Sequence, residues 1–191
     1  MKTGLFFGSF NPIHVGHMVL ANYMLEFTDL YEVWFVVSPH NPLKDKQTLL
    51  SQTHRLAMVR LAVEDHPHFK ASNIEFKLSQ PSYTVNTLAH LKEKYPKKDF
   101  SLIMGMDNLQ TFDKWKNHEH ILKNHSLYVY PRPRLDPGKF ANHKSVVLTD
   151  APIMEISSSF IRKAIKEQKD VSSFMPDKVA AYIKEMNFYK K

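Results

Sequence analysis

The chain contains no cysteine and no long apolar run, and we expect no signal peptide. Without cysteine it forms no disulfide and has no thiol nucleophile, which fits a reducing compartment, so we expect a cytoplasmic protein. The longest strongly apolar run, Val33–Val37, is far too short to span a bilayer, and Met1-Lys2-Thr3 leads straight into a predicted strand. We therefore expect no membrane partner.

The sequence also lacks internal repeats, low-complexity segments and any stretch that resembles a linker between domains. At 191 residues it is long enough to bury a substantial core. The simplest interpretation is a single domain that covers residues 1–191.

The charge is unbalanced, with a net value of +7 and a pI of about 9.4. Such a basic chain could bind nucleic acid. The lysines, however, are spread along the sequence, and no basic strand face carries interleaved aromatic residues. This favours a basic surface around small anionic substrates. We expect no nucleic-acid partner, and the sequence leaves a homo-oligomer open.

Short apolar runs alternate with amphipathic segments along the chain, which indicates an α/β protein. The predicted strands are Leu5–Phe7, Tyr31–Ser38, Ala71–Leu78, Phe100–Met104, Leu127–Tyr130 and Ser145–Leu148. The predicted helices cover 18–27, 51–63, a segment ending at 95, a segment ending at about 166, and 177–186. The pattern predicts a Rossmann-like, doubly wound parallel sheet of about six strands in the order 3-2-1-4-5, with its switch point between strands one and four.

The stretch Gly8–His17 lies between the first predicted strand and the first predicted helix, where open α/β sheets bind phosphates. Gly8 would let the backbone approach a ligand closely. His14 and His17 lie three residues apart, so both rings can share one helix face, next to the N–H groups of the helix start. These donors carry no permanent charge, which suits a polyphosphate whose charge changes during a reaction. Taken alone, the two histidines could also be surface residues or a metal-binding pair.

This turn contains neither the G-x-x-x-x-G-K-[ST] motif of a P-loop nor the G-x-G-x-x-G motif of dinucleotide-binding folds. It resembles the signature of the nucleotidyltransferase superfamily, G-x-F-[ND]-P-x-H-x-G-H, and matches it at every fixed position. The resemblance implies a fold of the nucleotidyltransferase type and an ATP site at this turn.

A second motif, Pro81–Leu88, leads into the third predicted helix. It is similar to the P-S-Y-T-x-x-T-L motif of the nicotinate-nucleotide adenylyltransferases. The resemblance implies that this turn lines the pocket for nicotinate mononucleotide, and uncharged donors at a helix start would suit a carboxylate. The alternative is that Ser82 or Thr84 only caps the helix.

The fourth predicted strand ends in Gly105-Met106-Asp107, beside the expected switch point. A carboxylate there can accept hydrogen bonds from ribose hydroxyls. The same family has G-x-D at this point, with the aspartate on the ATP ribose, and a tryptophan eight residues later. Asp107 and Trp115 match that pattern. The alternatives are an aspartate that caps the next short helix and a tryptophan half-buried under a loop.

Two further stretches offer groups for phosphates. Ile156–Arg162 opens a helix whose serines can cap it and bind anions. It resembles the I-S-S-T-x-[IL]-R motif of the superfamily, with Ser159 in place of the usual threonine. The other stretch is a loop stiffened by two prolines, which holds Lys44 after the second strand, where it could meet a phosphate. Family members commonly carry a basic residue in this loop, but Lys44 could also be an ordinary solvated lysine.

The four motifs occur in order from near the start of the chain to Arg162, so the resemblance to the nicotinate-nucleotide adenylyltransferases extends nearly end to end. The resemblance implies transfer of the adenylyl group of ATP to nicotinate mononucleotide in NAD biosynthesis, giving deamido-NAD and pyrophosphate. Mg²⁺ would accompany ATP, and we expect no metal site made of protein side chains. The catalytic residues we assign are His14, His17, Lys44 and Arg162. The ATP-binding residues are Gly8, Ser9, Phe10, His14, His17, Gly105, Asp107, Ile156, Ser158 and Arg162. The nicotinate mononucleotide-binding residues are Asn11, Lys44, Tyr83, Thr84 and Trp115.

Two alternatives stay open on the sequence alone. One is another adenylyltransferase of the superfamily, such as phosphopantetheine adenylyltransferase, which would share the first and last motifs but would not need Pro81–Leu88 or Trp115. The other is a non-catalytic nucleotide-binding protein.

Overall fold

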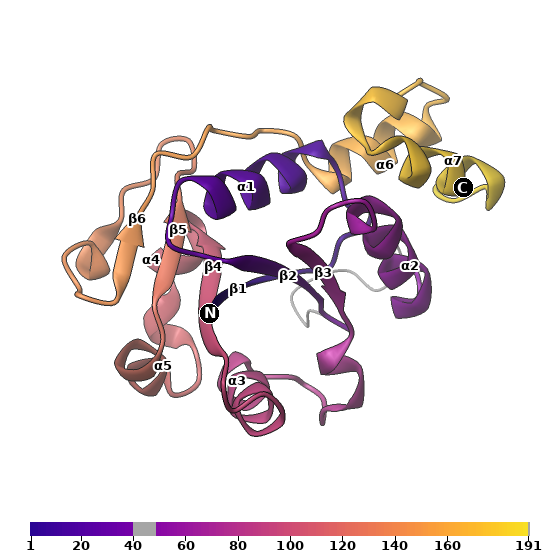
Figure 1. Cartoon of the computed structure of the whole chain (residues 1–191). Helices are drawn as coiled ribbons and strands as arrows, with labels where there is room; N and C mark the ends of the chain where they lie inside the picture. Colours follow the sequence, from indigo (N-terminus) through magenta and orange to yellow (C-terminus); the bar gives the residue numbers. More distant parts are fainter. Residues whose placement is uncertain (40–48, 191) are drawn as a thin grey trace.

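A six-stranded parallel sheet forms the centre of the computed structural model, which describes residues 1–39 and 49–190 (Figure 1). The strand order is β3-β2-β1-β4-β5-β6, and every neighbouring pair is parallel. The strands are β1 (Lys2–Gly8), β2 (Glu32–Val37), β3 (Phe69–Ser72), β4 (Asp99–Gly105), β5 (Leu127–Tyr130) and β6 (Val146–Leu148). The predicted doubly wound sheet and its strand order are confirmed.

Helices cover both faces of this sheet (Figure 1). They are α1 (Val15–Glu26), α2 (Gln52–Val63), α3 (Thr84–Lys94), α4 (Met106–Gln110), α5 (His118–Asn124), α6 (Ser158–Lys166) and α7 (Asp177–Glu185). Residues of α1, α2, α6 and α7 pack into one core cluster, and residues of α3, α4 and α5 pack into another. No helix in the described ranges is both long and apolar enough to cross a membrane.

Strand β2 shows why the sheet needs helices on both faces. All six of its residues are buried. Val33, Phe35 and Val37 belong to the cluster beneath α1 and α2, whereas Trp34 and Val36 belong to the opposite cluster. Successive side chains of a strand point to opposite faces, so a continuous apolar run buries apolar surface on each side.

The predicted strand Ala71–Leu78 is wrong over most of its length. Strand β3 ends at Ser72, and a 3-10 helix, η2 (Ile74–Lys77), follows it. The last pair between β2 and β3 joins Val36 to Ser72, and β2 itself ends one residue later. A longer β3 would have no partner strand for its backbone groups, so the chain turns away instead.

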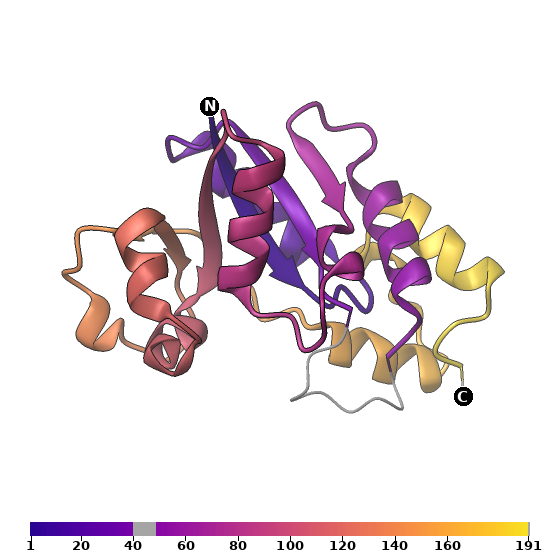
Figure 2. The same ribbon diagram turned by 90° about the horizontal axis from the view of Figure 1, so that it is seen from below.

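The first turn of the chain meets α6 at the edge of the sheet where β1 ends (Figure 2). The Ser158 hydroxyl donates to the Pro12 carbonyl at 2.8 Å, and Arg162 Nη1 donates to the Asn11 carbonyl at 2.8 Å. Segments 146 to 151 positions apart in sequence therefore form one structural unit at the carboxyl ends of the strands.

Candidate active site

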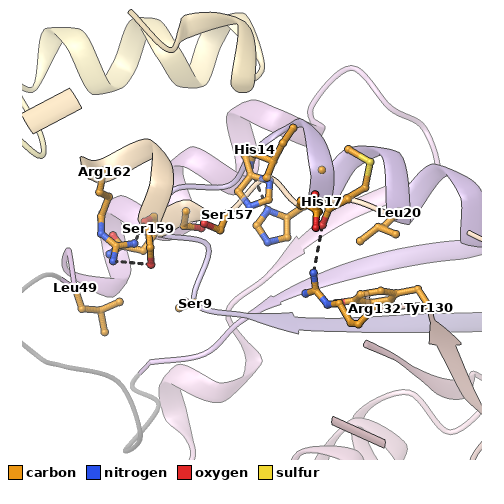
Figure 3. A pocket seen from close by; sticks show the side chains of 16 residues that line it. Ser9, His14, His17, Leu20, Leu49, Tyr130, Arg132, Ser157, Ser159 and Arg162 are labelled. Carbon is orange, nitrogen blue, oxygen red and sulfur yellow. Dashed lines mark hydrogen bonds between the residues drawn. The ribbon is translucent and has the colours of Figure 1, made fainter. Parts of the chain in front are cut away.

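A cavity of about 520 Å³ opens where the β1–α1 turn meets the segment that leads into α6 (Figure 3). Five parts of the chain contribute its walls: the first turn, α1, the end of β5 with the residues just after it, the residues around the start of α6, and Leu49 before α2. The lining residues are Ser9, Asn11, His14, Gly16, His17, Leu20, Leu49, Tyr130, Arg132, Met154, Glu155, Ile156, Ser157, Ser158, Ser159 and Arg162. Seven of the residues predicted for the site thus line one cavity: Ser9, Asn11, His14, His17, Ile156, Ser158 and Arg162.

The β1–α1 turn surrounds the buried ring of Phe10. Phe10 has a left-handed backbone conformation, with φ of 46°, and its ring packs into the aromatic core. A Cβ on Gly8 would lie 2.8 Å from that ring, so glycine is needed here for packing. Neither Gly8 nor Phe10 lines the cavity, whereas Ser9 and Asn11 do. The unusual conformation of Phe10 costs conformational energy, which the surrounding core offsets.

The two histidines lie side by side at the start of α1, as expected from their spacing (Figure 3). Their ring centroids are 3.7 Å apart. The backbone N–H of His14 donates to Nδ1 of His17 at 3.2 Å. Because Nδ1 accepts this bond, the network assigns the proton of the His17 ring to Nε2. His17 is therefore held as a hydrogen-bond donor at its far nitrogen.

His14 is neutral at pH 7. Its side chain is buried, and burial lowers its pKa to about 4, with a smaller contribution from the positive charge of Arg132. Nδ1 of His14 is buried without a hydrogen-bond partner among residues 1–39 and 49–190. Gly16 leaves room for this ring, since a Cβ on Gly16 would lie 3.1 Å from Nδ1 of His14.

The start of α6 forms the opposite wall of the cavity. Ser157 is the N-cap of the helix, and its hydroxyl accepts from the N–H three residues later at 3.2 Å. The Ser158 hydroxyl donates instead to the first turn. Its side chain therefore holds the two walls together, which differs from the predicted anion contact. The first N–H groups of α6 have no acceptor within the helix and remain suited to an anion.

Arg132 is the lining cation that the sequence analysis missed. It follows β5 by two residues, and its guanidinium lies 5.1 Å from the ring centroid of Tyr130. Its Nε lies 3.5 Å from Oδ1 of Asp107. Asp107 and Gly105 do not line the cavity. Asp107 is linked to it through its ion pair with the lining residue Arg132. Its position in the sequence could have indicated a site residue, because Arg132 follows a strand of the parallel sheet and so lies at the same sheet edge as the first turn.

The second and third motifs meet beside α3, outside the 520 Å³ cavity. Tyr83 is the N-cap of α3 and makes no side-chain capping bond, so the alternative of a cap at Ser82 or Thr84 does not hold. Lys116 Nζ lies 4.5 Å from the ring centroid of Tyr83, which brings the segment after Trp115 against the start of α3. Trp115 is half-buried against the core. Lys44 lies outside the described residues.

Arg55 of α2 is a second residue that the sequence analysis missed. It is fully buried, and its guanidinium donates to four backbone carbonyls. The acceptors are Leu50, Ser9, Ser38 and Pro39, at 2.7–3.0 Å. Burial lowers its pKa to about 10. Arg55 lies within the predicted helix 51–63, but three of its four acceptors belong to loops 16 to 46 positions away.

Comparison with known proteins agrees with this fold. Residues 5–164 match the family described as Cytidylyltransferase-like. A Flavobacterium psychrophilum protein named "Probable nicotinate-nucleotide adenylyltransferase" is 58% identical, and the alignment covers 100% of both chains. A Bacteroides thetaiotaomicron protein of the same name is 49% identical over 97% of this chain and 92% of its own. The Plasmodium falciparum nicotinic acid mononucleotide adenylyltransferase, solved with APC and with NaAD, is 20% identical, with a TM-score of 0.81 and coverage of 99% of this chain and 97% of that chain.

The parallel sheet, the histidine pair at the β1–α1 turn and the match to the cytidylyltransferase-like family define an α/β nucleotidyltransferase. The full-length relatives narrow this class further. The chain belongs to the nicotinate-nucleotide adenylyltransferase family.

Proposed function

We propose that the protein transfers the adenylyl group of ATP to nicotinate mononucleotide, giving deamido-NAD and pyrophosphate. The main support for this type of reaction is that His14, His17, Arg162 and the start of α6 all line one cavity. Full-length relatives at 58% identity, which bear the name of this activity, support the choice of substrate.

The chemistry is an in-line displacement at the α-phosphorus of ATP. An oxygen of the mononucleotide phosphate forms a new bond to that phosphorus, while the bond to the bridging oxygen breaks and its electron pair leaves with pyrophosphate. The attacking phosphate is already an anion, so no residue has to remove a proton from it. Catalysis then depends on position and on donors for the developing negative charge.

We assign the α-phosphate to the histidines and the leaving pyrophosphate to the opposite wall. His17 presents a donor at Nε2, since its Nδ1 is occupied by the His14 backbone. Arg162 uses Nη1 and Nη2 on Asn11 and Ser159, but a guanidinium has five N–H groups, so it can bond phosphate as well. The N–H groups at the start of α6 complete this wall.

Mg²⁺ would accompany ATP and lower the charge repulsion between its phosphates. Among residues 1–39 and 49–190, no group of three or more His, Cys, Asp or Glu side chains is arranged to hold a metal ion. Glu155 is the acidic lining residue of the cavity, and Asp107 pairs with Arg132. These surroundings fit an ion held mainly by phosphate oxygens and water.

The nicotinate ring would lie between α3 and the segment that carries Trp115. The contact between Lys116 and Tyr83 supports this assignment, because it brings the two motifs together. We assign the carboxylate to the N–H groups near Tyr83 and Thr84, which lack side-chain caps. Trp115 would stack on the ring, as flat aromatic groups do.

A coupled pyrophosphate-release assay tests the proposal, with ATP and one of three acceptors: nicotinate mononucleotide, nicotinamide mononucleotide or phosphopantetheine. We expect release with nicotinate mononucleotide and the appearance of deamido-NAD by chromatography. Faster release with phosphopantetheine would instead support the other adenylyltransferase. Binding of ATP without release in any mixture would indicate a non-catalytic nucleotide-binding protein.

A further inference from the structure

The last residues of the chain fold back onto the first turn. The Tyr189 hydroxyl donates to Oδ1 of Asn11 at 2.8 Å, across 178 positions of sequence. The tail does not continue α7, because Asn187 and Tyr189 both have left-handed backbones, with φ of 54° and 64°. A bulky residue keeps that conformation only where its surroundings hold it. The contact with Asn11 is one of those surroundings.

Asn11 receives a second bond at the same atom. The backbone N–H of Leu50 lies 3.3 Å from Oδ1 of Asn11. An N–H can only donate, so the atom that faces Leu50 is the oxygen of the carboxamide. The other end of the carboxamide is therefore the NH₂ group, which is a donor. Asn11 is buried and lines the cavity.

The two bonds come from structural units that are themselves anchored. Leu50 is fixed through its carbonyl, which accepts from Nε of Arg55 at 3.0 Å. Tyr189 is anchored through the preceding residue, Phe188, whose ring centroid lies 4.8 Å from that of His54 on α2. Burial also raises the pKa of Tyr189, so its hydroxyl keeps its proton and remains a donor. The orientation of Asn11 thus depends on the tail and on α2 together.

We propose that Tyr189 is a positioning residue, which sets the Asn11 carboxamide so that its NH₂ end serves the acceptor phosphate. This inference rests on the proposed adenylyl transfer and on the predicted contact of Asn11 with nicotinate mononucleotide. Tyr189 itself touches neither substrate in this arrangement. Its effect reaches the reaction through the carboxamide of Asn11, whereas Arg162 bonds the backbone carbonyl of the same residue.

The test is Tyr189→Phe, which removes one oxygen and keeps the ring. Loss of one neutral hydrogen bond predicts that KM for nicotinate mononucleotide rises by about three- to tenfold, while KM for ATP stays within about twofold. The matched control is Tyr182→Phe. Its hydroxyl bonds Nδ1 of His54 at 2.9 Å in the same C-terminal unit, so its loss should leave both constants unchanged.

Two further measurements separate positioning from general stability. In the Asn11→Ala background, Tyr189→Phe should have little additional effect on KM, because coupled residues are not additive. The side-chain NH₂ signals of Asn11 in an NMR spectrum, assigned with Asn11→Ala, should shift in Tyr189→Phe and not in Tyr182→Phe. The NMR comparison needs no catalysis, so it tests the contact between Tyr189 and Asn11 separately from adenylyl transfer.

Three outcomes would overturn the inference. One is an active enzyme in which Tyr189→Phe changes neither KM nor the Asn11 signals. Another is an increase in KM that persists in full without the Asn11 side chain. The third is a lower melting temperature with unaltered kinetics, which would reduce Tyr189 to a structural residue. An inactive wild type with shifted Asn11 signals would overturn the proposed function and the role toward the acceptor phosphate, whereas the orientation of Asn11 by Tyr189 would stand.

Discussion

At the scale of single residues, the donor nitrogen of His17 carries the clearest kinetic prediction. His17→Ala should lower kcat by on the order of a hundredfold or more, as the loss of one donor to a transition state does. The fold should survive, because the ring is only partly buried at the cavity. Initial rates at saturating ATP measure the effect, and His120→Ala, an exposed histidine on α5, is the control. Near-normal turnover would remove His17 from the mechanism.

His14 carries a prediction about pH. Its pKa is about 4 in the folded chain and about 6.5 in the unfolded chain, so the unfolded chain takes up the proton first as pH falls. The stabilisation is fully present above pH 6.5 and is lost progressively toward pH 4. Urea unfolding across this range should show wild type losing more stability than His14→Gln, by on the order of a few kcal/mol. Parallel curves for the two proteins would show that His14 is not held neutral.

At the scale of elements, Arg55 links α2 to the loops that end β1 and β2. Arg55→Lys keeps the charge but offers three donors from a single nitrogen, which cannot reach carbonyls on several sides. The loss of charged hydrogen bonds, each contributing about 1.5–3 kcal/mol, should lower the melting temperature by several degrees.

The same change should also weaken ATP binding, because Ser9 would lose the donor that fixes its carbonyl. Calorimetry with ATP and a thermal scan measure the two effects. Arg60→Lys, an exposed residue on the same helix, should change neither. An unchanged thermal scan for Arg55→Lys would mean that the four carbonyls find other donors.

The strands also show how much of the fold could be predicted from the sequence. The apolar runs of β1, β2 and β4 were enough for the sheet and its order, because buried parallel strands leave a continuous signal. Residues 74–77 carry an equally alternating pattern but form η2, since β2 ends and offers no partner. Local pattern does not report where a neighbouring strand stops.

The residues of the candidate site also fall into those that could be predicted from the sequence and those that could not. Motif residues such as His14 and Arg162 could be predicted, because their positions next to a strand or helix start are local features. Arg55, Arg132 and Tyr189 could not be assigned their contacts. Each makes contacts with parts of the chain 16 to 178 positions away, which depend on packing that no single stretch encodes.

At the scale of the whole molecule, the chain builds its site from both ends. The first turn accepts hydrogen bonds from α6 and from the tail. The walls of the cavity are therefore complete only when these C-terminal segments have packed against the first turn. The acceptor pocket that we propose lies elsewhere, between α3 and Trp115. ATP and the pyridine ring would therefore rest on different units of the fold, and a change in one should spare the other.

Trp115→Ala tests this division. Stacking supplies affinity for any flat pyridine ring, about 0.5–1.5 kcal/mol beyond the buried area, so nicotinate and nicotinamide mononucleotides should both bind several-fold more weakly. ATP affinity should be nearly unchanged. Discrimination would come from the donors near Tyr83, since an amide brings its own donor and leaves one of them unpaired at a cost of about 1–3 kcal/mol.

The decisive quantity is the ratio of kcat/KM for the two mononucleotides, measured in wild type, Trp115→Ala and Trp115→Phe. Trp115→Phe keeps a flat ring and should retain most of the affinity. The ratio should be the same in all three proteins, because stacking does not distinguish a carboxylate from an amide. A ratio that collapses in Trp115→Ala would show that the tryptophan sets specificity. Unchanged acceptor binding would leave it as a residue that only packs on the core, and the pyridine ring would then have to bind away from the α3 start.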